Sequence, residues 1–239
     1  MPDWRNPQEY EFTQRLTAAQ WAWEFLRRNP VYQAEWRDFM TTWRELEAEY
    51  GKPSQRDIAA WKRDSRAWLP ADRCQQSDCR VDGDKVLIEC ALGARWGFYK
   101  FPPDPRDDDP VGGKRLVWRE VPLEIPLLEA EAVAPGDAHR AALIFDLSLP
   151  LAPQMEQAKR QLQIEQRRRV SAGRLVPPRV ADHADDLARG LRLLDAAAQA
   201  VPLQEQARVF RLDTEDAGKA LSRALSLRDG GYRNLLWLH

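Results

Sequence analysis

Residues 21–32 read Trp-Ala-Trp-Glu-Phe-Leu-Arg-Arg-Asn-Pro-Val-Tyr, and this stretch ends one predicted helix and begins the next. Thr17 is placed to cap the first helix, and Gln20 three residues later completes a capping box. The first helix ends at Asn29-Pro30, because the residue before a proline avoids the α-helical backbone conformation. The same pair opens the second helix, with Asn29 as its cap and Pro30 at its first position. The pattern therefore predicts two consecutive helices with a sharp joint.

Aromatic side chains recur at helical spacing on both predicted helices. In the second helix the apolar positions alternate between spacings of four and three, from Tyr32 to Tyr50, and Gly51 is a typical helix end. We expect these faces to meet each other or a partner, with core packing favoured over a ligand site. A surface of this size also fits contacts between subunits. The candidates for packing and subunit contacts are Trp21, Phe25, Tyr32, Trp36, Phe39 and Trp43.

The composition is that of a globular protein with a polar surface. Hydrophobic residues make up 44% of the 239 residues and charged residues 31%. No apolar run is long enough to span a bilayer, and the first residues lack the apolar core of a secretory signal. We therefore expect a cytoplasmic protein with no membrane partner. The three cysteines, an odd number, indicate free thiols in a reducing compartment.

The charges balance, with 36 Lys plus Arg against 37 Asp plus Glu. Affinity for DNA comes largely from neutralising phosphates, so any DNA surface on this chain has to be a local basic patch. The helix predicted from Pro153 has such a patch, since only Glu156 and Glu165 offset its cations. A solvated face at a subunit interface is an equally weighted interpretation of this helix. The candidate DNA-binding residues are Lys159, Arg160, Arg167, Arg168, Arg169, Arg174, Lys219, Arg223 and Arg228.

The predicted fold class is α+β, with three consecutive parts. Residues 1–70 are expected to be a wholly helical N-terminal module, with Ser54 capping its third helix. Residues 71–152 are predicted to form a small antiparallel β region, with a hairpin bend at Asp82-Gly83. Its strand candidates are residues 86–90, 96–101, 115–121 and 140–149, with an irregular edge at 123–128 and an exposed loop at 102–113. Residues 140–149 are expected to be the best buried strand.

Residues 153–239 are expected to be a basic helix followed by a helical C-terminal module. Beyond the linker at residues 171–178, Asp182 is predicted to cap a helix that ends near Ala200. A short helix and a final one, capped by Asp213 or Thr214, follow with short joints. This outline matches a helix-turn-helix, although many helical bundles share it. The last helix would present Lys219, Ser222, Arg223 and Arg228.

Two sets of residues resemble a family of bacterial transcriptional activators. Its members trigger excision of integrative and conjugative elements or, as with RovC, activate type VI secretion genes. Asp3-Trp4-Arg5, Tyr10 and residues 21–32 resemble its N-terminal module, and residues 144–154 and 230–236 resemble its C-terminal module. Residues 71–140 carry no motif that we can place.

This resemblance implies a homo-oligomer, hexamer-like by analogy, that acts on double-stranded promoter DNA. RNA polymerase or another regulator is a further candidate partner. Family members with the C-terminal module alone are thought to act as antiactivators. A protein-binding antiactivator without direct DNA contact is therefore the alternative hypothesis.

Patterns for catalysis and metal binding are weak in this sequence. The cysteines lack Cys-x2-Cys spacing, and the scattered histidines fit surface or capping roles better than ligand roles. Asp107-Asp108-Asp109 fits a solvated loop better than a cation site, and a metal-dependent nuclease there is a third hypothesis. Gly112-Gly113-Lys114 lacks the pattern of a phosphate-binding loop, and no nucleophile elbow is present. We therefore expect no enzyme, no cofactor and no metal. The residues considered are Cys74, Cys79, Cys90, His139, His183 and His239.

Overall fold

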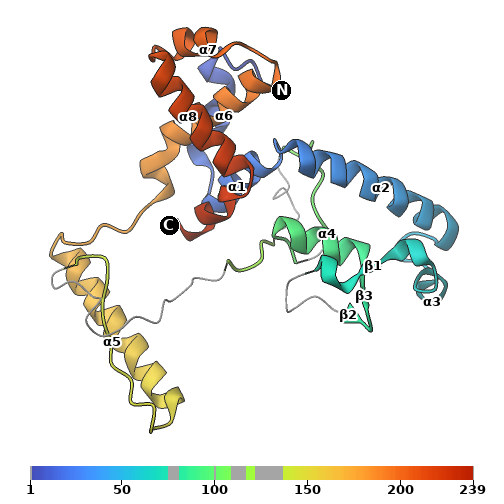
Figure 1. Cartoon of the computed structure of the whole chain (residues 1–239), viewed down its shortest axis with the longest axis horizontal. Coiled ribbons are helices and arrows are strands. Elements are labelled where there is room, and N and C mark those ends of the chain that lie inside the picture. The colour runs from blue at the N-terminus through green and yellow to red at the C-terminus, as the bar shows by residue number, and fades with distance from the viewer. Residues whose placement is uncertain (1, 75–80, 100, 109–116, 122–136, 239) are drawn as a thin grey trace. The chain divides into compact units, whose positions relative to one another are not determined.

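The computed structural model describes residues 2–74, 81–99, 101–108, 117–121 and 137–238 (Figure 1). The predicted α+β class is confirmed, because helices dominate and a small antiparallel sheet lies between the helical parts. The chain divides into two compact units, which are described separately. Unit 1 comprises residues 1–121 and 180–238, and unit 2 comprises residues 122–179. The sequence-based boundaries at residues 70 and 152 stay predictions.

The first helices of unit 1 begin and end where local chemistry predicts. They are η1 (Pro7–Arg15), α1 (Ala18–Leu26) and α2 (Pro30–Tyr50). The capping box at Thr17 is confirmed, since the Gln20 side chain accepts from the Thr17 amide at 2.8 Å and the Thr17 hydroxyl accepts in return. Asn29 Oδ1 accepts from the amides of Val31 and Tyr32 at the start of α2. Gly51 ends α2 with a φ of 89°.

The aromatic faces of α1 and α2 pack against different parts of unit 1 (Figure 1). The α1 helix packs against α6 (Ala184–Ala198), α8 (Thr214–Arg228) and η6 (Gly231–Trp237). The α2 helix packs against α3 (Ile58–Trp61), η2 (Ser65–Ala67) and α4 (Ile88–Trp96). The two faces meet at the joint, where the rings of Trp23 and Tyr32 lie edge to face with centroids 6.1 Å apart. Most of each face is therefore covered by residues distant in sequence.

The predicted packing residues lie inside this core. Trp21, Phe25, Tyr32, Trp36, Phe39 and Trp43 are at most 8% exposed. Such side chains already have their packing partners within the same chain. Burial agrees with the core packing expected for these residues, and their role in subunit contacts stays a prediction.

The expectation that residues 1–70 are wholly helical was wrong. The third helix is the single turn α3, and its cap is Asp57, whose Oδ1 accepts from the Ala60 amide at 2.9 Å, instead of Ser54. Asp64 then caps η2 by accepting from the Arg66 amide. The two capping aspartates, Asp57 and Asp64, divide this region into two short helices, since an aspartate side chain accepts from backbone amides and favours a new helix start.

The sheet of unit 1 is smaller than predicted. Its described strands are β1 (Trp68–Pro70), β2 (Val81–Asp82) and β3 (Lys85–Leu87), antiparallel in the order β1-β3-β2. The hairpin at Asp82-Gly83 is confirmed, with Gly83 at a φ of 66°. The strand expected at 86–90 is confirmed only for Val86 and Leu87 of β3, because α4 begins at Ile88. The strand expected at 96–101 was wrong in its first residue, which ends α4, and Phe98 forms only an isolated bridge. The buried positions of α4 repeat every three or so residues, which suits a helix face.

The other strand predictions have mixed outcomes. Trp118 makes only an isolated antiparallel bridge, to Phe98. Residues 109–116 and 122–136, which include the predicted segment 123–128, lie outside the described residues. The prediction of a buried strand at residues 140–149 was wrong, because this segment is irregular and its Ile144 is 95% exposed. An apolar run becomes a buried strand only where a neighbouring strand pairs with its backbone.

The C-terminal helices of unit 1 largely follow the prediction. They are η5 (Val180–His183), α6, α7 (Leu203–Phe210) and α8. Asp213 caps α8 by accepting from the Asp216 amide at 2.7 Å, as predicted. Asp182 lies within η5 instead of capping α6. Gly190 allows α6 to pack closely against α8 and α1, because an added Cβ there would lie 3.4 Å from the Ala224 Cβ and 3.5 Å from the Phe25 ring.

Cysteine chemistry differs from the expectation at one position. Cys74 is disulfide-bonded, so the prediction of free thiols was wrong there. Among the described residues, no helix is both long and apolar enough to cross a membrane. The described part of the chain also contains no group of three or more His, Cys, Asp or Glu side chains placed to hold a metal ion.

Glu89 on α4 is expected to make stability depend on pH. Burial raises the pKa of this carboxyl group, and its Oε2 atom has no hydrogen-bond partner in the described structure. A raised folded-state pKa favours the neutral acid, so the wild-type protein loses stability as pH rises above the usual glutamate pKa. The substitution Glu89→Gln should increase the free energy of unfolding by about 1 kcal/mol near pH 8 and have little effect at about pH 4.

Urea denaturation at both pH values measures this difference. Glu11→Gln, at an exposed position of η1, is the matched control and should leave stability unchanged at either pH. An equal gain for Glu89→Gln at both pH values would contradict the assignment of the effect to ionisation.

Candidate nucleic-acid interface

The basic helix predicted from Pro153 is α5 (Leu151–Ser171), and it forms unit 2 with an extended segment at residues 137–149. Gln154 holds one end of this segment, because its side chain accepts from the Asp146 amide and donates to the Asp146 carbonyl, both at 2.9 Å. Arg169 holds the other end by donating to the carbonyls of Asp137, Ala138 and Arg140. The segment therefore runs antiparallel to α5 and is attached near both ends of the helix.

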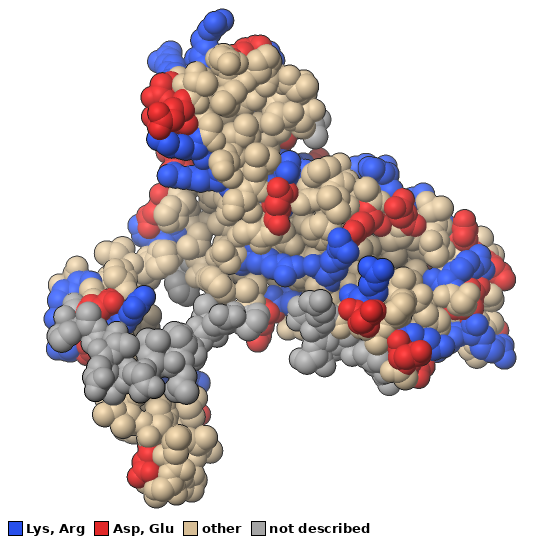
Figure 2. All heavy atoms as spheres, viewed as in Figure 1, with Lys and Arg blue, Asp and Glu red and all other residues tan. Residues whose placement is uncertain are grey.

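The α5 helix exposes most of its cations. No described residue of α5 is buried. Figure 2 shows Lys and Arg gathered at the C-terminal end of α5, whereas the N-terminal half is mostly uncharged. The exposed cations of α5 that make no ion pair with another described residue are Lys159, Arg160 and Arg167, and Arg174, just beyond the end of the helix, is in the same state. These four predicted residues therefore keep their charge available to a ligand.

Two further predicted cations of α5 are partly committed to Glu165. Arg168 Nε lies 2.7 Å and Arg169 Nε 2.8 Å from carboxylate oxygens of Glu165. The hydrogen bonds from Arg168 and then Arg169 lower the pKa of Glu165 to about 2. Arg168 remains mostly exposed, whereas Arg169 is largely covered and also holds the extended segment. Arg169 thus has a structural role in unit 2.

The predicted cations of α8 are mostly neutralised. Lys219 Nζ lies 2.6 Å from Glu215 Oε1 and 3.7 Å from Asp216 Oδ1, and Glu215 raises the pKa of the lysine. Arg228 pairs with Asp229 at 2.7 Å. Among the predicted α8 contacts in the described structure, Arg223 is the exposed cation without an ion pair. The acidic first turn makes the start of α8 a poor surface for phosphates.

The joint between α7 and α8 is short. It consists of residues 211–213, and Arg211 adopts a left-handed conformation with a φ of 55°. The α8 helix packs against both α6 and α7 (Figure 1). A joint of this length between packed helices is typical of a helix-turn-helix.

A buried charge cluster connects the N-terminal helices of unit 1 to α6. Arg28 Nε lies 2.8 Å from Asp195 Oδ1, and Arg28 also pairs with Glu24. Burial alone would lower the pKa of Arg28, but Asp195 and Glu24 together raise it. Tyr10 donates its hydroxyl to Asp195 at 2.5 Å, and burial and this hydrogen bond raise the pKa of Tyr10. The cluster thereby satisfies charges that would be costly to bury alone.

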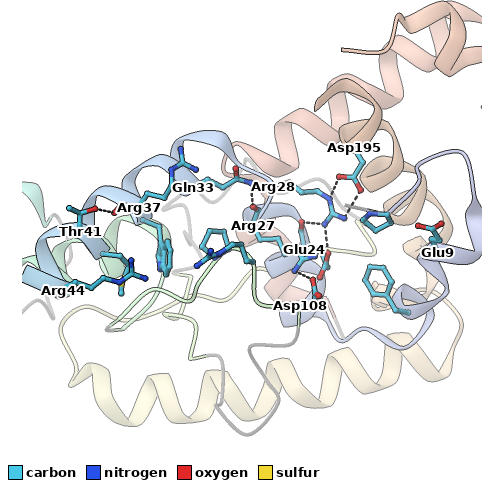
Figure 3. A pocket seen from close by; sticks show the side chains of 16 residues that line it. Glu9, Glu24, Arg27, Arg28, Gln33, Arg37, Thr41, Arg44, Asp108 and Asp195 are labelled. Carbon is cyan, nitrogen blue, oxygen red and sulfur yellow. Dashed lines mark hydrogen bonds and ion pairs between the residues drawn. The ribbon is translucent and has the colours of Figure 1, made fainter. Parts of the chain in front are cut away.

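A cleft of about 1080 Å³ opens beside this cluster. Figure 3 shows Glu24, Arg27, Arg28 and Asp195 close together along it, with Arg44 and Thr41 at the opposite end from Glu9. Sequence reasoning missed this cleft. Part of a signal was present, since Arg37 and Arg44 lie seven residues apart on α2, which places them on one side of a helix. The contribution of the loop residues Pro105–Asp108 was not visible in the sequence.

Residues 3–68 match the model of a proteobacterial transcriptional regulator-like domain. No curated protein matches the chain, and no solved structure matches it. The matched segment includes η1, α1 and α2 and ends at Trp68. Residues 3–68 thus carry a transcriptional regulator-like domain, which indicates a role in transcription regulation.

Proposed function

We propose that this protein is a DNA-binding transcriptional activator that works as a homo-oligomer on the promoters of secretion or mobile-element genes. The regulator-like domain at residues 3–68 supports the transcriptional role. The observation that carries the DNA-binding part is the group of exposed, unpaired cations on α5, in a chain with a net charge of −1. Such a group concentrates positive charge where the molecule as a whole offers none.

The α5 cations would act on the DNA backbone. Lys159, Arg160 and Arg167, with Arg174 just beyond the end of the helix, neutralise phosphates. Each contact releases counterions and adds affinity without reading the sequence. Arg223 on α8 is a further candidate contact. Because one such patch is small, several copies of the chain joined in an oligomer would combine weak patches on one duplex.

The experiment is fluorescence anisotropy of the full chain on its own upstream DNA over a series of salt concentrations. The dissociation constant is expected to rise steeply with salt, with a logarithmic slope of about 0.9 per phosphate contact. Light scattering on the same sample should give a molar mass that is a multiple of the single chain. Binding that is equally strong at low and high salt would contradict a phosphate-led mode.

A second candidate is a protein-binding antiactivator, and unit 2 contains an observation that favours it. Ile144 and Leu147 of the extended segment are 95% and 84% exposed, and Met155 and Ile164 of α5 are also exposed. Exposed apolar side chains in such number are typical of surfaces that bind another protein. Under this hypothesis the purified chain co-purifies with another regulator and never shifts its own upstream DNA.

A further inference from the structure

We infer that the cleft beside α2 binds a small organic phosphate of about nucleotide size through Arg37 and Arg44. The cleft lies wholly within unit 1, and α1, α2, the loop at residues 105–108 and Asp195 of α6 all contribute to it. This inference is independent of the proposed DNA contacts, which use α5.

The acids along the cleft are already committed to partners inside the protein. Glu24 pairs with Arg27 and Arg28, and Asp195 pairs with Arg28 and accepts from Tyr10. Asp108 Oδ1 lies 2.7 Å from Arg27 Nη1. Glu9 accepts from the Asp3 amide at 2.6 Å. Three of these carboxylates therefore share the guanidinium groups of Arg27 and Arg28, whereas Glu9 has a hydrogen bond from a backbone amide.

Two arginines at the α2 end of the cleft, in contrast, have no such partners. Arg37 and Arg44 are exposed, and neither guanidinium group forms an ion pair or hydrogen bond with another described residue. Arg106, across the cleft, is held by Asp104 at 2.8 Å, with its guanidinium carbon 5.6 Å from the centre of the Trp36 ring. The charge at the α2 end of the cleft is therefore positive. Guanidinium groups favour phosphate oxygens, which they can bind in a bidentate way.

The remaining walls suit the organic part of such a ligand. Phe12, Met40 and Pro105 line the cleft, and Phe12 is 44% exposed. The volume of about 1080 Å³ lies near the upper end of the range for small-molecule sites. The cleft therefore offers free arginines and partly exposed apolar side chains to the same ligand. A nucleotide combines the two matching groups, its phosphates and its base.

Isothermal titration calorimetry on the full chain tests this inference with three probes: a nucleoside triphosphate, the matching unphosphorylated nucleoside, and inorganic pyrophosphate. We expect the triphosphate to bind and the nucleoside to bind far more weakly. The double variant Arg37→Gln/Arg44→Gln should weaken triphosphate binding by at least about tenfold. Arg63→Gln, at an exposed arginine elsewhere in unit 1, is the matched control and should change nothing.

Two results would overturn the inference. One is the absence of binding by both phosphate probes, or binding that the double variant leaves unchanged. The other is a combined result: a short DNA duplex displaces the triphosphate, and the double variant loses affinity for DNA as much as for the triphosphate. In that case the cleft binds the phosphates of nucleic acid instead of a small organic phosphate. Neither result depends on whether α5 binds DNA, because substitutions on α5 test that separately.

Discussion

Replacing Lys159, Arg160 and Arg167 together with glutamine is expected to weaken binding to duplex DNA by about a hundredfold at about 0.15 M salt. These side chains are exposed and make no ion pair with a described residue, so the substitutions remove charge and leave the packing of α5 intact. If each one contacts a phosphate, the logarithmic salt slope should fall by about 3. Anisotropy titrations of wild type and variant over a salt series measure both quantities.

A control with the same loss of charge separates a local patch from a general effect. Arg15→Gln, Lys52→Gln and Arg63→Gln together remove three exposed cations from unit 1. This control should keep nearly wild-type affinity. Equal loss of binding in both triple variants would show that total charge matters and that α5 has no special role. Unchanged binding in the α5 variant would remove the proposed DNA surface.

Replacing Asp195 with alanine is expected to lower the free energy of unfolding by about 3–5 kcal/mol. The Arg28 side chain is only 6% exposed, so it would remain buried with Glu24 as its single acidic partner. Tyr10 would lose the acceptor of its buried hydroxyl. Both changes leave buried polar groups without a hydrogen-bond or ion-pair partner, and this lowers the free energy of unfolding more than the loss of a surface contact does.

Urea denaturation followed by circular dichroism measures this effect. Asp186→Ala is the control, because its pair with Arg189 is exposed and should contribute less than about 1 kcal/mol. If Asp195→Ala does not accumulate in folded form, Asp195→Asn keeps the shape of the side chain and should show a smaller loss. A change below about 1 kcal/mol for Asp195→Ala would refute the structural role of the cluster.

The helix starts were the most predictable part of this molecule. The capping box at Thr17 and the caps at Asn29 and Asp213 depend on hydrogen bonds between residues two or three positions apart. The start of the third helix was predicted wrongly, because the cap was placed at Ser54 and the structure places it at Asp57. Local rules rank such alternatives poorly when both residues can accept from a nearby amide.

The candidate interface was only partly predictable. The positions of the α5 cations were visible in the sequence. Their pairing with Glu165, and that of Lys219 with Glu215, could also have been read from spacings of three and four residues. The hydrogen bonds from Arg169 to three carbonyls about thirty residues away could not. The cleft beside α2 was equally hidden, because its two sides come from separate segments.

Taken by itself, the sequence determined where the helices capped by Thr17, Asn29 and Asp213 begin and which residues are apolar or charged, because those properties depend on a residue and its near neighbours. Only the tertiary structure decided which apolar runs are buried: Trp43 is in the core while Ile144 is almost fully exposed. It also decided which charged side chains form ion pairs inside the protein, since Arg28 pairs with Asp195, 167 positions away in the sequence. Burial and ion pairing over such distances depend on how the folded chain brings segments together, and local patterns do not encode that.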